Sequence, residues 1–300
     1  DSNATITGSH TLNNVTFSKV NVTNSEGSIT IASGTTLTAA GTLTFDDSGT
    51  LGVDVNTGTI AAQGNIVVAD TDDYTGTATL LINGTGDQTF TGGGSATAGG
   101  LPNVQINKTT GTLTLASIIR ATSNWTYTAG TLALGTSTIV FAHPYNVAQT
   151  ITGSHALHHV TFDPNWSGET TITIAAGTTL TVAGTLTMDN TSTGAAHVNT
   201  GTLAAKGNIV VADANDYRGS ATILINGTGD QTFTSSATRT SGGLPNIQIN
   251  KTAGILTLSG TIMATENWTY TAGTLVTTGS TVSFEGTQTI TGSHTLNHVT

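Results

Sequence analysis

The chain has 300 residues, of which 36% are hydrophobic and only 8% are charged, whereas about 25% charged residues is usual for soluble domains. The formal net charge is −10, opposite in sign to that of a nucleic-acid binder, which must displace phosphate counterions, so we expect no nucleic-acid partner. Cysteine is absent, which excludes disulfides and thiolate chemistry. No apolar run approaches the roughly 18 residues of a membrane helix, and we expect no membrane insertion of this segment.

Apolar residues alternate with threonine along many short segments. In chain order, clear examples are residues 36–38, 41–45, 111–115 and 171–174. Successive side chains of a strand point to opposite faces, so this alternation predicts strands with one apolar face. Turn-forming residues recur every six to ten positions over much of the chain, too often for helices of ordinary length.

Three such strands with their turns occupy about 20 to 24 residues, which is typical of one turn of a parallel β-solenoid. We therefore predict an all-β, right-handed parallel β-solenoid with one continuous core. A string of antiparallel sandwich modules is the alternative. Threonine is expected to line the outside. The residues predicted to face inward are Leu43, Phe45, Leu113, Leu115, Ile172, Ile174, Leu186 and Met188.

The chain contains a long tandem repeat. Residues 64–91 recur as residues 207–234 with only five differences, so Gly64 corresponds to Gly207, and the same offset relates most equivalent positions of the two copies. We divide the sequence into a first solenoid repeat unit at 1–148, a second at 149–287 and the start of a third at 288–300. Each full repeat has about 140 residues and holds two half-units. Residues 5–16 and 289–300 are nearly the same, and we expect the array to extend beyond the chain.

Short motifs of the style GTLT, GNI, DQTFT and LPNVQINKTTGTLTL recur along nearly the whole chain. In this style the sequence resembles the β-solenoid stretches of large repetitive bacterial surface and fibre proteins, including filamentous-haemagglutinin-like and autotransporter-like adhesins. The resemblance implies an exported structural or adhesive role. It assigns no functional residue.

These observations predict a non-catalytic extracellular or cell-surface structural protein, a segment of a filament, stalk or sheath. Its expected partner is itself, by head-to-tail stacking or within a longer array, with glycans or other cells as further partners. The seven basic residues are scattered, which argues against an enzyme with grouped catalytic charges, and no cofactor is expected. An ice-binding or glycan-binding adhesin is the alternative, because threonine pairs are numerous.

One acidic loop and its copy offer oxygen ligands of the kind that calcium accepts. A solvated turn in which aspartate caps its own backbone is the alternative reading. The calcium candidates are Asp70, Asp72, Asp73, Asp213 and Asp216.

Asparagine followed two residues later by serine or threonine marks candidate glycosylation sites. The candidates that recur in both repeats are Asn83, Asn107, Asn124, Asn226, Asn250 and Asn267.

Histidine and aromatic residues form two further patterns. His155 and His159 lie four residues apart, which is about 13 Å along a strand and too far for one metal ion. Trp125 and Tyr127, with their copies Trp268 and Tyr270, could stack on a sugar. Alignment of the half-units places Trp125 over Leu43, an inward position, which favours core packing instead.

Overall fold

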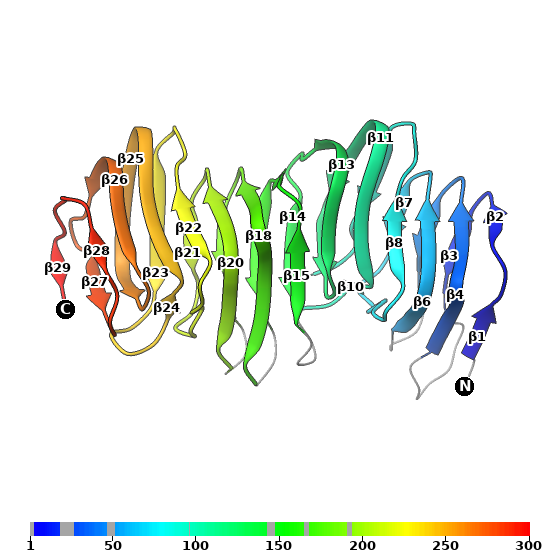
Figure 1. The fold of residues 1–300 in the computed structure, drawn as a ribbon, viewed down its shortest axis with the longest axis horizontal. Coiled ribbons are helices and arrows are strands. Elements are labelled where there is room, and N and C mark those ends of the chain that lie inside the picture. Colours follow the sequence, from blue (N-terminus) through cyan, green and yellow to red (C-terminus); the bar gives the residue numbers. More distant parts are fainter. Residues whose placement is uncertain are drawn as a thin grey trace. The chain divides into compact units, whose positions relative to one another are not determined.

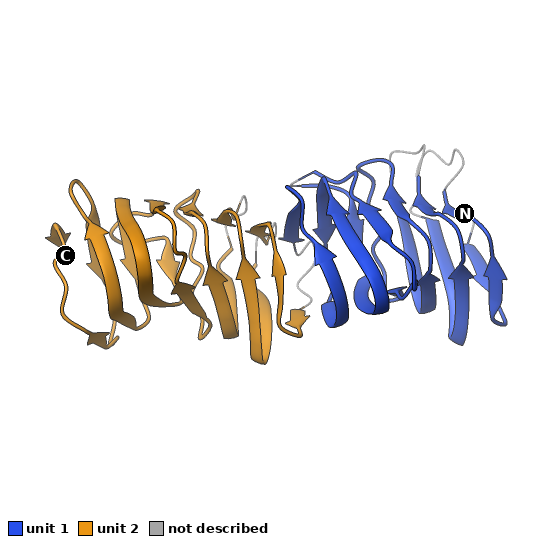
Figure 2. Cartoon of the chain, turned by 90° about the horizontal axis from the view of Figure 1, so that it is seen from above, with its two compact units in different colours: residues 1–142 blue, residues 143–300 orange. Residues whose placement is uncertain are grey.

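The computed structural model (Figure 1) describes residues 3–18, 27–46, 52–95, 97–142, 148–164, 168–190 and 194–300. The strands pair in parallel and form a β-solenoid with turns of about 23 residues, about 11 turns in all. The predicted all-β parallel solenoid is therefore confirmed, and the antiparallel sandwich alternative is wrong. Two compact units, Asp1–Ala142 and His143–Thr300, divide the chain (Figure 2). Among the described residues no helix has the length and hydropathy to cross a membrane.

Unit 1 shows how the turns are built. The strands β1, β2 and β3 form one turn, and they pair with the first part of β4, the second part of β4 and β5 of the next turn. The described strands of this unit are β1 (Asn3–Ile6), β2 (His10–Leu12), β3 (Val15–Phe17), β4 (Gly27–Ala39), β5 (Leu43–Phe45), β6 (Val53–Ala62), β7 (Ile66–Val68), β8 (Thr79–Ile82), β9 (Gln88–Thr91), β10 (Gly100–Leu101), β11 (Asn103–Ala116), β12 (Ile118–Ala121), β13 (Trp125–Ala133) and β14 (Thr138–Ala142).

Unit 2 repeats this construction. Its turns stack in regular register, for example Leu186 on Ile209 and Met188 on Val211. The described strands of this unit are β15 (Gln149–Thr152), β16 (His155–Leu157), β17 (His159–Asp163), β18 (Thr170–Val182), β19 (Leu186–Met188), β20 (Ala196–Ala205), β21 (Ile209–Val211), β22 (Thr222–Ile225), β23 (Gln231–Ser236), β24 (Gly243–Leu244), β25 (Asn246–Ala264), β26 (Trp268–Val276), β27 (Thr281–Phe284), β28 (Ile290–Thr291) and β29 (His298–Val299).

The core lies inside the turns, as the alternation predicts. The eight residues predicted to face inward are all at most 1% exposed. In β18 buried positions alternate with half-buried ones on each side of a central bend. Threonine occupies most of the outward positions there, because its branched side chain favours the extended backbone and its hydroxyl stays hydrated.

Glycine is required where the chain bends and where neighbouring turns meet. Gly34 and Gly177 lie at the bends of β4 and β18 with φ of +75°, a conformation that few other residues adopt. A Cβ atom on Gly64 would lie 2.1 Å from the carbonyl oxygen of Gly41 in the preceding turn. Glycine at such a contact lets the backbones of successive turns approach closely.

The structural repeat is shorter than the sequence repeat. Each turn of about 23 residues is hydrogen-bonded to the next turn, so the turn is the repeating unit that the structure shows. A structural repeat of about 140 residues stays a prediction. The similarity between the two copies is a property of the sequence, and each copy spans several turns.

Candidate functional site

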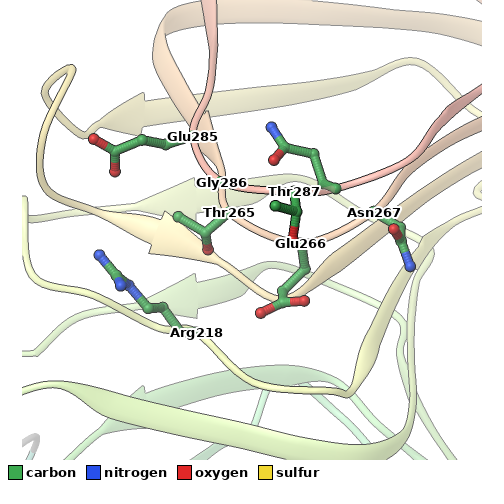
Figure 3. A pocket seen from close by; sticks show the side chains of 8 residues that line it. Arg218, Thr265, Glu266, Asn267, Glu285, Gly286 and Thr287 are labelled. Carbon is green, nitrogen blue, oxygen red and sulfur yellow. The ribbon is translucent and has the colours of Figure 1, made fainter.

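A polar cavity of about 460 Å³ lies on unit 2 (Figure 3). One side comes from the turn between β25 and β26, and another from the turn between β27 and β28. The pairing of Ala264 with Phe284 sets these two turns next to each other. The third side is Arg218, which precedes β22. The lining residues are Arg218, Thr265, Glu266, Asn267, Glu285, Gly286, Thr287 and Gln288.

Backbone and side-chain hydrogen bonds fix the two turns. The Thr265 hydroxyl donates to the carbonyl oxygen of Leu244 at 3.0 Å, and the Glu285 N–H donates to Ala264 at 3.1 Å. Asn267 Oδ1 accepts the N–H of Thr289 at 2.9 Å. The walls of the cavity are therefore held by the solenoid and do not depend on a ligand for their position.

Arg218 forms an ion pair at the edge of the cavity. One of its terminal nitrogens lies 3.0 Å from Asp216 Oδ2, and its side chain is 42% exposed. Asp216 Oδ1 also accepts the N–H groups of Gly242 at 3.0 Å and Gly243 at 2.8 Å. The Nε atom of Arg218 is buried and has no hydrogen-bond partner among the described residues.

Unit 1 holds the corresponding aspartate differently. Asp73 accepts the N–H of Gly100 at 2.6 Å and pairs with Arg120 at 3.3 Å. Arg120 is only 2% exposed. In the second copy Met263 takes the position equivalent to Arg120, whereas Arg218 takes the position equivalent to Thr75. The arginine that pairs with this aspartate is therefore buried in unit 1, as Arg120, and partly exposed in unit 2, as Arg218.

The predicted calcium residues lie in other interactions. Asp70 Oδ1 accepts the N–H of Asp72 at 2.9 Å and the hydroxyl of buried Tyr74 at 2.8 Å. Asp213 similarly accepts the hydroxyl of Tyr217 at 2.9 Å. Burial raises the pKa of Asp213, and the hydrogen bond from Tyr217 opposes this rise. Within the described part of the chain no group of three or more His, Asp or Glu is arranged to hold a metal ion, and calcium binding here stays a prediction.

Two histidines of unit 2, His155 and His159, form hydrogen bonds with backbone groups. His155 is buried and its Nδ1 lies 2.7 Å from the carbonyl oxygen of Gly153. His159 Nδ1 accepts the N–H of Thr185 at 2.9 Å, so this ring is neutral. In unit 1 the side chain of Asn14 does the same for Thr42 at 2.8 Å. Histidine and asparagine can replace each other at this position, because both offer a neutral hydrogen-bond acceptor to a backbone N–H of the next turn.

Acidification is expected to destabilise unit 2. Burial lowers the pKa of His155 and of His159 below 6.5, and neighbouring His158 lowers that of His159 further. The unfolded chain then binds more protons than the folded chain, so stability present above pH 6.5 is lost as the pH falls toward the lowered pKa values. The measurement is urea unfolding at about pH 7.5 and about pH 5.

The matched variant for this test is His159→Asn, which keeps the acceptor that Asn14 provides in unit 1. Its unfolding midpoint should change less with pH than that of the parent chain. An equal loss of stability on acidification in both proteins would contradict the assignment to His159.

The aromatic residues pack as the alignment predicts. Trp125 and Trp268 are fully buried, which confirms core packing of the tryptophans in place of a sugar-stacking platform. Tyr127 and Tyr270 are half-buried. The hydroxyls of Tyr127 and Tyr270 donate to Gly130 and Gly273 at 2.5 Å.

The candidate glycosylation sites differ in exposure. Asn124 and Asn267 are exposed, and the others are half-buried. The Oδ1 atoms of Asn83 and Asn226 are buried without a hydrogen-bond partner among the described residues. Glycosylation at all six positions stays a prediction.

Sequence reasoning missed the cavity, although a signal was present. Arg218, Glu266 and Glu285 are charged, whereas the equivalent positions of the first copy hold Thr75, Ser123 and Ala142. A comparison of the two copies for differences in charge finds these three residues.

Comparisons of the chain with protein-family models, curated proteins and solved structures found no match. The fold itself defines the chain as a β-solenoid repeat protein.

Proposed function

We propose that the chain is a non-catalytic structural segment of an extracellular or cell-surface filament, stalk or sheath that assembles by stacking β-solenoid turns end to end. The supporting observation is how each turn covers the one before it in parallel register. The last turn of the given sequence, residues 289–300, has no following turn here and is called the uncovered turn. Ile290 is 52% exposed and Val299 is 58% exposed. The same motif occurs at residues 150–160, where the following strands β18 and β19 cover it. There the corresponding Ile151 and Val160 are fully buried.

The uncovered turn also borders an apolar hollow. A cavity of about 420 Å³ is lined by Phe284, Ile290, Leu296 and Val299 together with Gly292, Ser293 and His294. Covering such a surface with another turn removes apolar area from water and gives the free strand edges hydrogen-bond partners. The partner that fits is another solenoid turn, from a second copy or from a longer array. Stacking of unlike ends along the axis of the solenoid repeats without closing into a ring and so builds a filament.

The surface composition supports the extracellular location. The chain is rich in outward threonine and poor in lysine and glutamate, and it resembles repetitive bacterial surface proteins in the style of its motifs. A structural role uses what the fold supplies directly, which is a stiff stack of hydrogen-bonded turns. An adhesive role is a second candidate, favoured by the polar cavity on unit 2.

The assembly is tested by charging the uncovered turn. Ile290→Lys with Val299→Lys is expected to abolish end-to-end assembly of the purified chain, because lysine at an open strand edge opposes pairing. Electron microscopy and sedimentation should show filaments of the parent chain and short dispersed particles of the variant. Ile255→Lys is the control, because Ile255 is also 38% exposed but belongs to β25, which is paired with strands on both sides. Dispersed parent chains at high concentration would overturn the proposal.

A further inference from the structure

The cavity around Arg218 presents hydrogen-bond donors and acceptors together. Arg218 and the amide nitrogen of Asn267 are donors, because the oxygen of Asn267 is already bound to Thr289. Glu266 and Glu285 are acceptors, and Figure 3 shows them on two different turns, with Arg218 on a third segment. Gln288 has a local role, since in its better orientation its amide nitrogen donates to the carbonyl oxygen of Glu285 at 3.1 Å. It positions the turn that carries Glu285.

Arg218 retains donors for a ligand. A guanidinium has five N–H donors, and the ion pair with Asp216 joins one of its terminal nitrogens to the carboxylate. The side chain is also 42% exposed, so a ligand in the cavity can reach it.

The charges of the cavity restrict the class of ligand. Arg218 contributes one positive charge, and Asp216, Glu266 and Glu285 contribute three negative charges, so an anion is repelled. A simple cation leaves the arginine donors unused and lies beside a like charge. Hydroxyl groups both donate and accept and carry no charge. The volume of about 460 Å³ is within the range of about 300–1,000 Å³ of small-molecule sites.

Unit 1 shows that the fold does not require these charges. Its corresponding turns carry Thr75, Ser123 and Ala142 in place of Arg218, Glu266 and Glu285. The need to pair Asp216 explains one cation near this position, because Met263 has replaced the buried arginine of unit 1. This need does not explain Glu266 or Glu285. Among the described residues, no hydrogen bond of the fold uses the carboxylates of these two glutamates.

We propose that this cavity binds an uncharged saccharide, a pyranose monosaccharide or disaccharide. Arg218 and Asn267 donate to hydroxyl or ring oxygens of the sugar, and the carboxylates of Glu266 and Glu285 accept hydrogen bonds from its hydroxyl groups. This binding is an activity of unit 2 beyond the structural role, and it does not depend on assembly. The assembly-blocking variant with lysine at 290 and 299 should therefore still bind.

The test titrates the full 300-residue chain with glucose, galactose, mannose, N-acetylglucosamine, maltose and lactose, followed by saturation-transfer NMR and calorimetry. At least one sugar should show saturable binding. Glu266→Ser with Glu285→Ala installs the residues of unit 1 and should weaken that binding at least about ten-fold, because hydrogen bonds to charged groups are lost. Its thermal unfolding should match that of the parent chain. Glu169→Ala removes an exposed carboxylate outside the cavity and should leave binding unchanged.

A second variant separates ligand binding from ion pairing. Arg218→Thr with Met263→Arg installs the arrangement of unit 1, in which a buried arginine pairs with the aspartate. It should keep the fold and lose the sugar at least about ten-fold. The proposal is overturned if none of the sugars binds saturably to the parent chain. It is also overturned if either cavity variant binds the sugar as tightly as the parent does.

Discussion

Lys108→Met is expected to lower the free energy of unfolding of unit 1 by about 3 kcal/mol or more. Lys108 is only 1% exposed, although lysine is among the least buried residue types. Its ammonium donates to the carbonyl oxygens of Gly84 at 2.6 Å and Gly86 at 2.9 Å, and to Gln88 Oε1 at 2.6 Å. Methionine fills a similar volume but leaves these three acceptors without a donor, and each unsatisfied buried group costs about 1–3 kcal/mol.

The loss should spread beyond one turn. Gln88 lies between the lysine and the preceding turn, since its amide nitrogen donates to Ala62 at 3.1 Å and to Gly64 at 2.5 Å. Lys108 therefore orients an amide that joins two further segments of backbone. Urea unfolding gives the stability change, and hydrogen exchange of the amides in β7, β9 and β11 should show which turns open.

Unit 2 provides the matched experiment. Lys251 makes the same contacts with Gly227, Gly229 and Gln231, at 2.6, 2.9 and 2.7 Å. Lys251→Met should destabilise unit 2 by a similar amount. Lys206 is exposed, and Lys206→Met should change stability by no more than about 0.5 kcal/mol. Buried-lysine variants as stable as the Lys206 variant would show that the ammonium is not needed.

Strand positions and core residues could be predicted because alternation is a local property. Each of the eight inward predictions rests on its immediate neighbours, and each is buried. The burial of Lys108 was also within reach, since Val104 and Ile106 have the same parity and are buried. The hydrogen-bond acceptors of Lys108 could not be predicted in this way, because they lie 20 to 24 residues earlier in the chain. A contact between turns depends on the register of stacking, which alternation does not specify.

The same limit applies to the cavity. Arg218, Glu266 and Glu285 line one cavity only because the solenoid returns to the same side after each turn. Asp70 and Asp213 are predicted either as calcium ligands or as residues that cap their own turn, and each accepts the hydroxyl of a buried tyrosine four residues later.

Phe45→Ala is expected to destabilise unit 1 by about 3–5 kcal/mol. Phe45 is fully buried and stands in a column of aromatic rings. Its centroid lies 5.5 Å from that of Phe17, with 18° between the rings, and 5.1 Å from that of Tyr74. Phe17 pairs with Phe45 in the next turn, and Tyr74 follows β7, whose Val68 pairs with Phe45. Removal of the Phe45 ring therefore leaves a cavity and removes its packing against both rings.

Unit 2 supplies the control for this replacement. Met188 occupies the position equivalent to Phe45 in the second copy and is paired with Phe162 as Phe45 is paired with Phe17. Phe45→Met therefore fills the space with a residue that the fold already accepts, and it should cost less than about 1.5 kcal/mol. Urea unfolding of the two variants gives the comparison. Equal destabilisation by alanine and methionine would show that the contact between aromatic rings, and not the filling of the core, holds these turns together.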